Sequence, residues 1–350
     1  MNEQYDVAIL GAGFEGSMLG IILACNGAKV VIVDAGTHPR FALGESTVRH
    51  TFRMIKIMAE RFGVPEFKTE FNSGKTIHQH VSSGFGIKTN FGFMLHHEGQ
   101  HQRPEEATQL VIPPYREGYE AHLFRQDTDA YLTYTAIHHG ATVKYHTRVK
   151  HVDTDSHGVS LETEKGETIR ARFVADASGG GHVLSRMWNL RDEPTRCKTN
   201  TRCLFTHMID VKPYDDLSLP NGVPKAPRRW YQGTCHHLFD GGWVWVIPFE
   251  QSPGVDEQGG ERGAELRHSQ VSQTHRHHAG PGMAPVPVPL PQYLRAVQGR
   301  QAGARLGVVR PPANLGQAER RRSLGNHGRR YGQRLFGCDL LARVGFVHWK

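Results

Sequence analysis

The chain has 350 residues, enough for one large or two ordinary domains with a substantial core. Its formal net charge of +8 is concentrated after residue 260, where arginine is frequent and acidic residues are sparse. Five cysteines without a CxxC pair argue against a disulfide framework, and no apolar stretch approaches about 20 residues. Because the N-terminus also lacks a signal-peptide pattern, we expect a cytoplasmic protein without a membrane partner.

The first predicted elements form a nucleotide-binding unit. A strand over residues 5–10 leads into a glycine-rich turn, and an apolar helix follows to about residue 26. Gly11 is expected to make the tight turn, Gly13 to let the backbone approach a pyrophosphate, and Gly16 to let the helix pack closely. The free N–H groups at the start of that helix would face the phosphates.

A second buried strand over residues 29–33 strengthens this prediction. It ends in Asp34, 18 residues after Gly16, close to the spacing expected of the acid that binds ribose hydroxyls. The strand, turn, helix, strand and acid together predict a dinucleotide site. At this point FAD and NAD both remain open.

The middle of the chain continues the α/β pattern. A helix is predicted over residues 48–62, followed by short strands between residues 71 and 95. Another helix is expected over residues 128–139, N-capped by Asp127 or a neighbour and ended by Gly140.

Three strands are then predicted, over residues 142–152, 159–163 and 168–175. The last runs into a second glycine-rich bend over residues 176–181. Because strand ends of a doubly wound sheet meet at one edge, we expect this bend to return to the nucleotide.

Residues 196–250 have a different character. A strand is predicted over residues 203–209, then a proline-rich linker, then a strand over residues 241–249. Because strand side chains alternate, this last strand places Trp243, Trp245 and Ile247 on one face.

These motifs resemble those of a known family. The turn Gly11/Gly13/Gly16, the segment Gly44-Glu45-Ser46 and the strand Trp243-Val244-Trp245-Val246-Ile247-Pro248 resemble the marks of the flavin-dependent halogenases of the tryptophan-halogenase family. The order and spacing agree over residues 1–250, and the WxWxIP motif selects FAD over NAD.

The resemblance implies an α/β fold of mixed α+β content. Its main part would be a Rossmann-like FAD-binding domain of the glutathione-reductase and single-component flavin monooxygenase type, with an antiparallel sheet on the substrate side. We expect the FAD-binding domain at residues 1–195, with an inserted segment 65–125 facing the substrate side. The segment 196–252 would carry WxWxIP, and residues 253–350 would form an irregular tail of low order.

The resemblance also implies the chemistry. A separate flavin reductase would supply reduced FAD, a flavin hydroperoxide would be attacked by chloride or bromide, and hypohalous acid would reach a lysine beside an electron-rich aromatic substrate. That substrate would be a small molecule, free or tethered to a carrier. The alternatives are an FAD-dependent aromatic hydroxylase, monooxygenase or reductase, and, in another class, a non-catalytic flavin-binding protein or a nucleic-acid-binding protein using the basic tail.

Site residues follow from matching positions. The catalytic lysine is predicted to be Lys88, with Lys75 as the alternative, and Glu45 is the accompanying acid. Burial between apolar strand residues would lower the pKa of such a lysine. No metal site is expected, and no nucleic acid partner. The expected FAD contacts are Gly11, Gly13, Phe14, Glu15, Gly16, Asp34, Ser46, Arg125, Asp176 and Gly179, and the expected tunnel wall is Trp243, Trp245, Ile247 and Pro248.

From about residue 250 the sequence loses periodicity and becomes rich in Gly, Pro and Arg. With third bases chosen freely, Val255–Gln273 reads one base later as an alternating strand, and Leu306–Ala313 reads as W-V-S-S-G-R-L. We therefore hypothesise a frameshift, natural or from sequencing, near residues 250–255. Sequencing the gene across this point tests it. Without the family's last flavin contact, impaired activity of this chain, weak retention of FAD and aggregation are expected.

Overall fold

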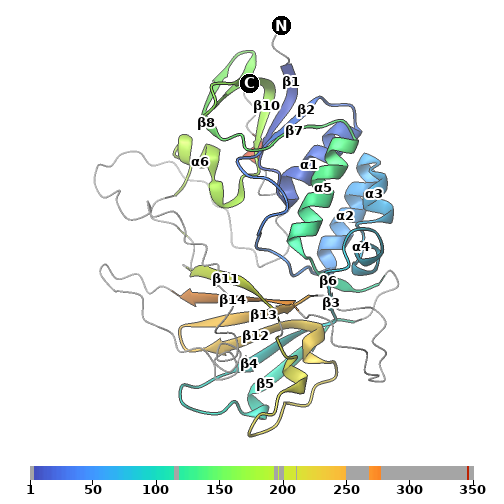
Figure 1. Ribbon diagram of the computed structural model, residues 1–350, viewed down its shortest axis with the longest axis vertical. Helices are drawn as coiled ribbons and strands as arrows, with labels where there is room; N and C mark the ends of the chain where they lie inside the picture. The colour runs from blue at the N-terminus through green and yellow to red at the C-terminus, as the bar shows by residue number, and fades with distance from the viewer. Residues whose placement is uncertain are drawn as a thin grey trace, which may run out of the picture.

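The structure is a computed structural model that describes residues 4–113, 118–192, 196, 201–209, 211–249, 268–276 and 345–346 (Figure 1). It has two sheets, one above the other in Figure 1, with a two-stranded sheet between them. Helices accompany the sheet that contains the N-terminal strand. Among the described residues, no helix has the length and apolar character needed to cross a membrane.

The first sheet has seven strands in the order β7-β2-β1-β10-β9-β8, with β15 pairing with β10. Its first four strands run parallel, and β8, β9 and β10 form an antiparallel meander. Four apolar residues of β2 are all buried, as expected of a central parallel strand. The strands are β1 Gln4–Leu10, β2 Val30–Val33, β7 Thr142–Lys144, β8 Val149–Asp155, β9 Gly158–Thr163, β10 Thr168–Asp176 and β15 Gly345–Phe346.

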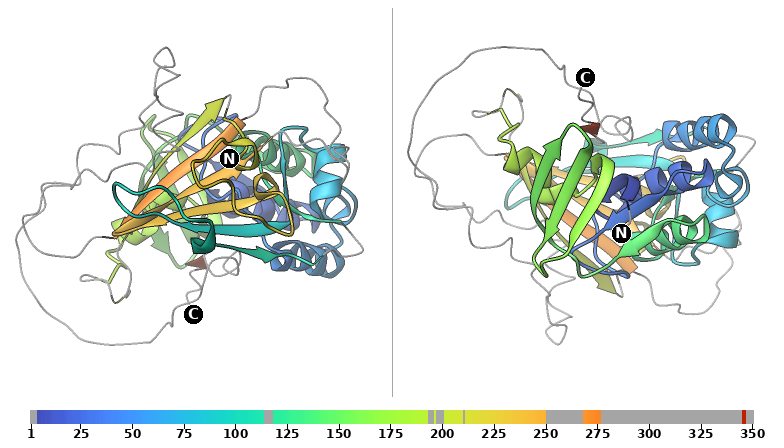
Figure 2. Two further views of the ribbon diagram at one scale, coloured as in Figure 1. Left: turned by 90° about the horizontal axis from the view of Figure 1, so that it is seen from below. Right: turned by 90° about the horizontal axis from the view of Figure 1, so that it is seen from above.

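Seen from above, the helices between residues 14 and 138 gather at one side of the view, and β8, β9 and β10 of this sheet lie at the other (Figure 2). A large apolar core joins the helices to β1 and β2, and a second core lies on the opposite face beneath a sixth helix. The helices are α1 Phe14–Cys25, α2 Arg49–Phe62, α3 Pro65–Thr69, α4 Gly74–His80, α5 Arg125–His138 and α6 Val183–Met187, with a 3-10 turn η2 at Gly179–Gly181.

The second sheet has six strands in the order β11-β14-β13-β12-β4-β5. All neighbours are antiparallel except β12 and β4, which are parallel. Short 3-10 turns accompany it: η1 Pro104–Glu106, η3 Tyr214–Asp216 and η4 Trp230–Gln232. The strands are β4 Asn90–Leu95, β5 Ala107–Val111, β11 Thr201–Ile209, β12 Gly233–Phe239, β13 Gly242–Pro248 and β14 His268–Arg276, and the two-stranded sheet pairs β3 Gly86–Lys88 with β6 Glu120–His122.

The mixed α/β fold with a Rossmann-like half is therefore confirmed, and most predicted elements are present. The helix predicted over residues 48–62 is α2, ended by Gly63 in the left-handed conformation. The strand predicted over residues 142–152 is wrong as one strand. His146, with φ of 50°, separates β7 from β8, because β7 pairs with β2 whereas β8 pairs with β9.

Two further corrections concern helices. Helix α5 begins at Arg125 after the N-cap Phe124, so Asp127 is not its cap, and the Asp127 carboxylate instead accepts a 2.6 Å hydrogen bond from Ser82 Oγ. The short strands expected between residues 71 and 95 begin only at Gly86, because α4 precedes them with Ser73 as a side-chain N-cap.

Within the region expected to be an irregular tail, the described segment His268–Arg276 is β14, which lies between β11 and β13 in the second sheet. Strand pairing on both sides satisfies backbone N–H and C=O groups whatever the side chains are, which periodicity analysis does not capture. Apart from β14 and β15, residues 253–350 lie outside the described part of the chain, as does the proposed frameshift point.

Candidate functional site

The turn between β1 and α1 contains two glycines that the fold itself requires. Gly11 has φ of +105°, its N–H donates to Val33 O at 2.8 Å, and a Cβ there would press on the Ala177 carbonyl. A Cβ at Gly16 would overlap the Gly11 carbonyl oxygen. The predicted roles of Gly11 in the turn and Gly16 in close packing are therefore visible in the geometry.

Gly13 is different, because no protein atom demands a glycine there. The nearest atom to a Cβ built on Gly13 would be Arg40 Nη2 at 3.8 Å, and its backbone is extended. Gly13 is the N-cap of α1, where N–H groups and the helix dipole favour an anion. The open space at this helix end fits the approach of a pyrophosphate. Phe14 and Glu15 occupy the first turn of α1, Phe14 buried and Glu15 half-buried.

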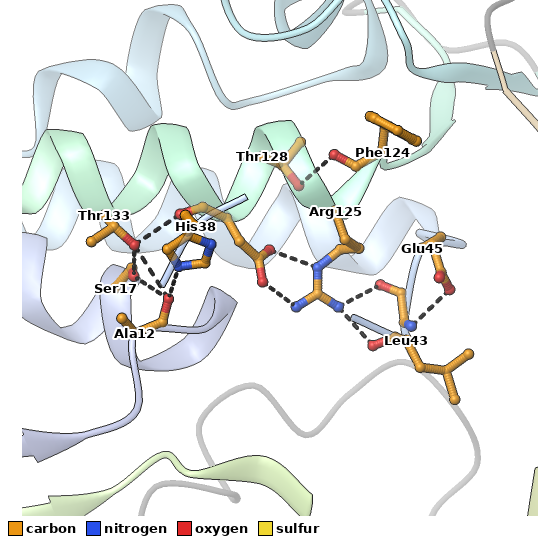
Figure 3. Close-up of polar contacts among 11 residues, drawn as sticks. Ala12, Ser17, His38, Leu43, Glu45, Phe124, Arg125, Thr128 and Thr133 are labelled. Atoms are coloured by element: carbon orange, nitrogen blue, oxygen red, sulfur yellow. Dashed lines mark hydrogen bonds and ion pairs between the residues drawn. The ribbon is translucent and has the colours of Figure 1, made fainter. Parts of the chain in front are cut away.

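Three side chains hold this turn in position through one carbonyl (Figure 3). His38 Nε2 donates to Ala12 O at 2.7 Å, and the hydroxyls of Ser17 and Thr133 each lie 3.2 Å from the same oxygen. Because a carbonyl only accepts, His38 must carry a proton on Nε2. The turn is thus fixed before any ligand binds.

Asp34 lies at the end of β2 beside this turn. Its carboxylate accepts from Ala12 N at 2.6 Å, Gly36 N at 2.8 Å and Arg40 Nη1 at 2.6 Å. Burial opposes ionisation of Asp34, but the hydrogen bonds from Arg40 and from the Ala12 and Gly36 backbone outweigh it and hold its pKa below the usual value. Oδ2 carries only one of these bonds, which leaves acceptor capacity for a ribose hydroxyl.

A cavity of about 440 Å³ opens at the carboxyl edge of β1, β2 and β10. The predicted second bend forms one of its walls, since Ala177 N donates to Leu10 O at 2.9 Å and so fixes the bend against the first turn. The polar part of the lining includes Asp34, Arg40, Arg148, Ser178 and Arg186.

Asp176 and Gly179 shape this bend. Asp176 Oδ1 accepts from Ser178 N at 3.0 Å and from Ser178 Oγ, while Oδ2 accepts from Leu184 N at 2.8 Å, in the first turn of α6. Asp176 therefore holds the bend together in the structure. Gly179 has φ of +57°, and no described atom lies within 4 Å of a Cβ built on it, so its main chain is accessible to a ligand.

Arg125 connects α5 to the loop that precedes Glu45 (Figure 3). Its guanidinium donates to both carboxylate oxygens of Asp129, at 2.7 and 2.9 Å, and to the carbonyls of Leu43 and Gly44, at 2.7 and 3.2 Å. It also lies 5.4 Å from the centroid of the Phe14 ring. Arg125 thus fixes the loop beside the α1 N-terminus.

Glu45 and Ser46 follow in this loop. Glu45 is 2 % exposed, and its carboxylate accepts from Gly44 N at 2.7 Å. Ser46 is half-buried, and its hydroxyl lies 2.8 Å from Thr234 Oγ1 of β12. The loop therefore joins the first sheet to the second.

Lys88 is completely buried at the end of β3. Its Nζ donates to Thr47 O, lies 3.4 Å from Glu120 Oε2 on β6, and lies 3.8 Å from the centroid of the Phe91 ring. Burial lowers the pKa of Lys88 to about 8, and Glu120 opposes this effect. The alternative, Lys75, is exposed on α4. Only Lys88 has the desolvated environment that the sequence analysis required of the lysine.

A hydrogen-bond chain passes beside this lysine. His122 is buried, its Nδ1 lies 3.0 Å from Pro248 O, and its Nε2 lies 2.9 Å from Thr234 Oγ1. Burial lowers the pKa of His122 to about 3, so the ring is neutral. Since the Pro248 carbonyl only accepts, Nδ1 donates to it, Thr234 donates to Nε2, and Ser46 donates to Thr234. The Ser46 oxygen is left as an acceptor at the open end of this chain.

The WxWxIP strand contributes one aromatic face. Trp243 and Trp245 have ring centroids 5.7 Å apart, which confirms that they share a face of β13. His236 on β12 lies between Trp245 at 6.0 Å and Phe91 at 6.3 Å. An aromatic row therefore runs from Lys88 to the two tryptophans.

The end of the motif joins the two-stranded sheet. A Cβ on Gly86 would overlap the Pro248 carbonyl, so β13 and β3 are in close contact there. Ile247 is buried beside it. Pro248 thus fixes His122 and, through β3, the position of Lys88.

Sequence reasoning did not find Glu120, His122, Thr234 or His236. A signal existed for the first two, because Glu120 and His122 alternate with apolar Ala121 and Leu123 and so place two polar side chains on one strand face. Neither the two histidines nor the other described residues form a metal-binding group of three or more His, Cys, Asp or Glu side chains.

Comparisons with known proteins agree with this geometry. The family model for an FAD binding domain matches residues 4–218. Tetracycline 7-halogenase from Kitasatospora aureofaciens is 41% identical over 254 residues, covering 73% of this chain and 45% of that protein. Monodechloroaminopyrrolnitrin halogenase PrnC from Pseudomonas fluorescens is 43% identical over 252 residues, covering 72% and 44%.

Among solved structures, halogenase PltM in complex with phloroglucinol and FAD superposes with a TM-score of 0.69 at 31% identity, covering 84% of this chain and 55% of that one. The chain therefore spans less than half the length of the two curated relatives.

Proposed function

Because the chain belongs to the FAD-binding domain family, we propose that it is a flavin-dependent halogenase that acts on an electron-rich aromatic substrate. The observation that carries the proposal is the row of side-chain contacts that joins the predicted lysine to the WxWxIP strand. Lys88, Phe91, His236, Trp245 and Trp243 follow one another along it.

The residues present fit FAD. The N-terminus of α1 at Gly13 would face the pyrophosphate, and Asp34 would accept from the adenosine ribose. Arg40 lies near both groups, 2.6 Å from Asp34 and next to the open side of Gly13. The cavity between Asp34 and Ser178 would take the adenosine half.

The flavin half would lie toward the loop 43–46. Arg125 fixes the carbonyls of Leu43 and Gly44, and the Ser46 oxygen remains an acceptor for an N–H or O–H group. Asp176 and Gly179 would support the cofactor through the bend that they form. These residues would hold the cofactor beside a first turn that is already held by hydrogen bonds within the chain.

When bound and reduced, FAD would supply the chemistry that turns oxygen and a halide into an electrophilic halogen. A separate flavin reductase would deliver the reduced cofactor. The chain's own residues would bind the cofactor and receive the halogen: Lys88 presents a buried amine, and the Phe91 ring, 3.8 Å away, shields it from water. Glu45, the acid predicted to accompany the catalytic lysine, would lie in the loop 43–46 beside the flavin half of the cofactor. Planar aromatic surfaces also suit a planar substrate, free or tethered to a carrier.

The experiment uses the purified full chain with FAD, a flavin reductase, NADH, oxygen and a phenol such as phloroglucinol. A halogenase gives a product with the chlorine or bromine isotope pattern only when that halide is present. Addition of oxygen to the substrate without any need for halide would instead identify a hydroxylase and contradict the proposal.

A further inference from the structure

We propose that Glu120 is the residue that holds Lys88 in place through a buried ion pair and sets its charge. This inference rests on the proposed function in one respect, namely that the Lys88 amine receives the halogen. Glu120 touches neither cofactor nor substrate in this scheme, so it is a positioning residue that acts through Lys88.

The backbone brings the pair together. In the antiparallel pairing of β3 with β6, Lys88 lies directly opposite Glu120. The Nζ to Oε2 distance is 3.4 Å, and the two side chains are 0% and 4% exposed. Direct cross-strand neighbours on one face hold their separation as long as the strands stay paired.

Glu120 is itself held by a second element. Its Oε1 accepts a 2.6 Å hydrogen bond from the backbone N–H of Arg49, the first residue of α2. The positive end of the helix dipole favours the carboxylate there. One oxygen of Glu120 therefore faces the helix and the other faces Lys88.

Lys88 has two further fixed contacts. Its Nζ donates to Thr47 O and lies over the Phe91 ring. Thr47 is fixed to Ala121 of β6 by backbone and hydroxyl bonds of 2.8–3.0 Å. The Lys88 amine therefore contacts three groups: the Glu120 carboxylate, the Thr47 carbonyl and the Phe91 ring. The positions of these groups do not depend on the Lys88 side chain.

The groups that face the pair explain its charge. Burial lowers the pKa of Lys88 to about 8 against the attraction of Glu120, and burial raises the pKa of Glu120 against Lys88 and the Arg49 backbone. His122 and His236 are neutral, since burial lowers the pKa of each and the charge of Lys88 lowers it further. Burial thus moves the pKa of the Lys88 amine and the pKa of the Glu120 carboxyl toward each other, which favours proton transfer from Lys88 to Glu120 relative to the same pair in water.

This transfer has a chemical use. The Lys88 ammonium gives a proton to the Glu120 carboxylate: one N–H bond breaks, one O–H bond forms, and the net charge stays constant. The amine then has the lone pair that an electrophilic halogen requires, while Glu120 keeps the proton nearby.

The test follows lysine Cε and glutamate Cδ carbon shifts by NMR in the full chain, with Lys88 and Glu120 assigned through the backbone. In the wild-type protein, we expect the Glu120 carboxyl carbon to show a step at the pH where Lys88 titrates. A Glu120 carbon that shows no change at that pH would overturn the proposal.

Variants test the same point independently. Glu120→Gln keeps the acceptor for Arg49 but removes the charge, so the pKa of Lys88 should fall by about one unit or more. Glu120→Asp should retain part of that difference. The matched control is Glu167→Gln, which removes the exposed partner of Lys144 at 2.7 Å and should leave the pKa of Lys88 unchanged. An unchanged Lys88 pKa in Glu120→Gln would also overturn the proposal.

These measurements need neither flavin nor halide, so they separate the two proposals. Coupled titration in a chain that never halogenates would contradict the proposed function alone. Halogenation with an independently titrating Lys88 would contradict the role of Glu120 alone. With both intact, the lower limb of the kcat–pH profile should move to lower pH in Glu120→Gln.

Discussion

The amine of Lys88 lies 3.4 Å from the carboxylate of Glu120, and both side chains are buried between the two sheets. Removing two charges from water costs free energy, and removing either partner would leave the other charge buried without its counterion. The contacts to Thr47, Phe91 and the Arg49 backbone offset the cost of burying the pair.

Gly13 is predicted to matter for FAD rather than for the fold. Gly13→Ala should weaken FAD binding about tenfold or more with an unchanged melting temperature, because a Cβ there would fill the space proposed for the pyrophosphate while its nearest protein atom, Arg40 Nη2, is 3.8 Å away. Gly16→Ala is the contrast: its Cβ would overlap the Gly11 carbonyl and should cost about 1–3 kcal/mol of stability. Flavin fluorescence quenching and thermal unfolding measure the two effects. Equal FAD affinity in Gly13→Ala would remove this glycine from the binding site.

Arg125 is predicted to stabilise the fold and the cofactor loop together. Arg125→Met leaves the carboxylate of Asp129, 1% exposed, without its bidentate partner, and should lower the free energy of unfolding by about 3 kcal/mol. The double variant Arg125→Met/Asp129→Asn should recover part of this loss, since the buried charge is then absent. Urea denaturation of both variants provides the comparison, and a loss in the single variant below about 1 kcal/mol would contradict a structural role for the pair.

His122 is predicted to tie β13 to β6. His122→Leu leaves the Pro248 carbonyl and the Thr234 hydroxyl without this partner, and should cost about 2 kcal/mol or more. The control His80→Leu changes an exposed histidine at the end of α4 and should stay within about 0.5 kcal/mol. Similar losses in the two variants would show that the His122 bonds add nothing.

Buried neutral histidines predict sensitivity to mild acid. The pKa values of His122 and His237 are lowered by burial to about 3, and that of His96 to about 4. Each stays neutral in the native state but binds a proton on unfolding below about 6.5, so stability is fully present above that pH and falls below it. The expected slope is about 1.4 kcal/mol per pH unit for each histidine.

Unfolding measured from pH 7 down to pH 4.5 tests this directly. In His122→Leu the free energy of unfolding should be lower at every pH in this range. Its slope against pH should be smaller by the contribution of one histidine proton. A free energy of unfolding that is constant over this range would mean that these histidines are protonated in the native state.

Sequence patterns predicted the parts of the site that local chemistry determines. Glycine spacing located the first turn and Asp34, and strand alternation placed Trp243 with Trp245. The partners of Lys88 were not predictable in this way, because Glu120 reaches it only through the register of two strands separated by more than thirty residues. For the same reason β14 was missed, since its pairing with β11 and β13 is set by their backbones rather than by its own periodicity.

The most direct measurement is the halide dependence of product mass for the full chain supplied with FAD, a flavin reductase and a phenol. The account predicts a halogenated product that needs chloride or bromide and disappears in Lys88→Ala, while FAD binding in that variant stays within about twofold. A product formed without halide, or halogenation that survives Lys88→Ala, would contradict it.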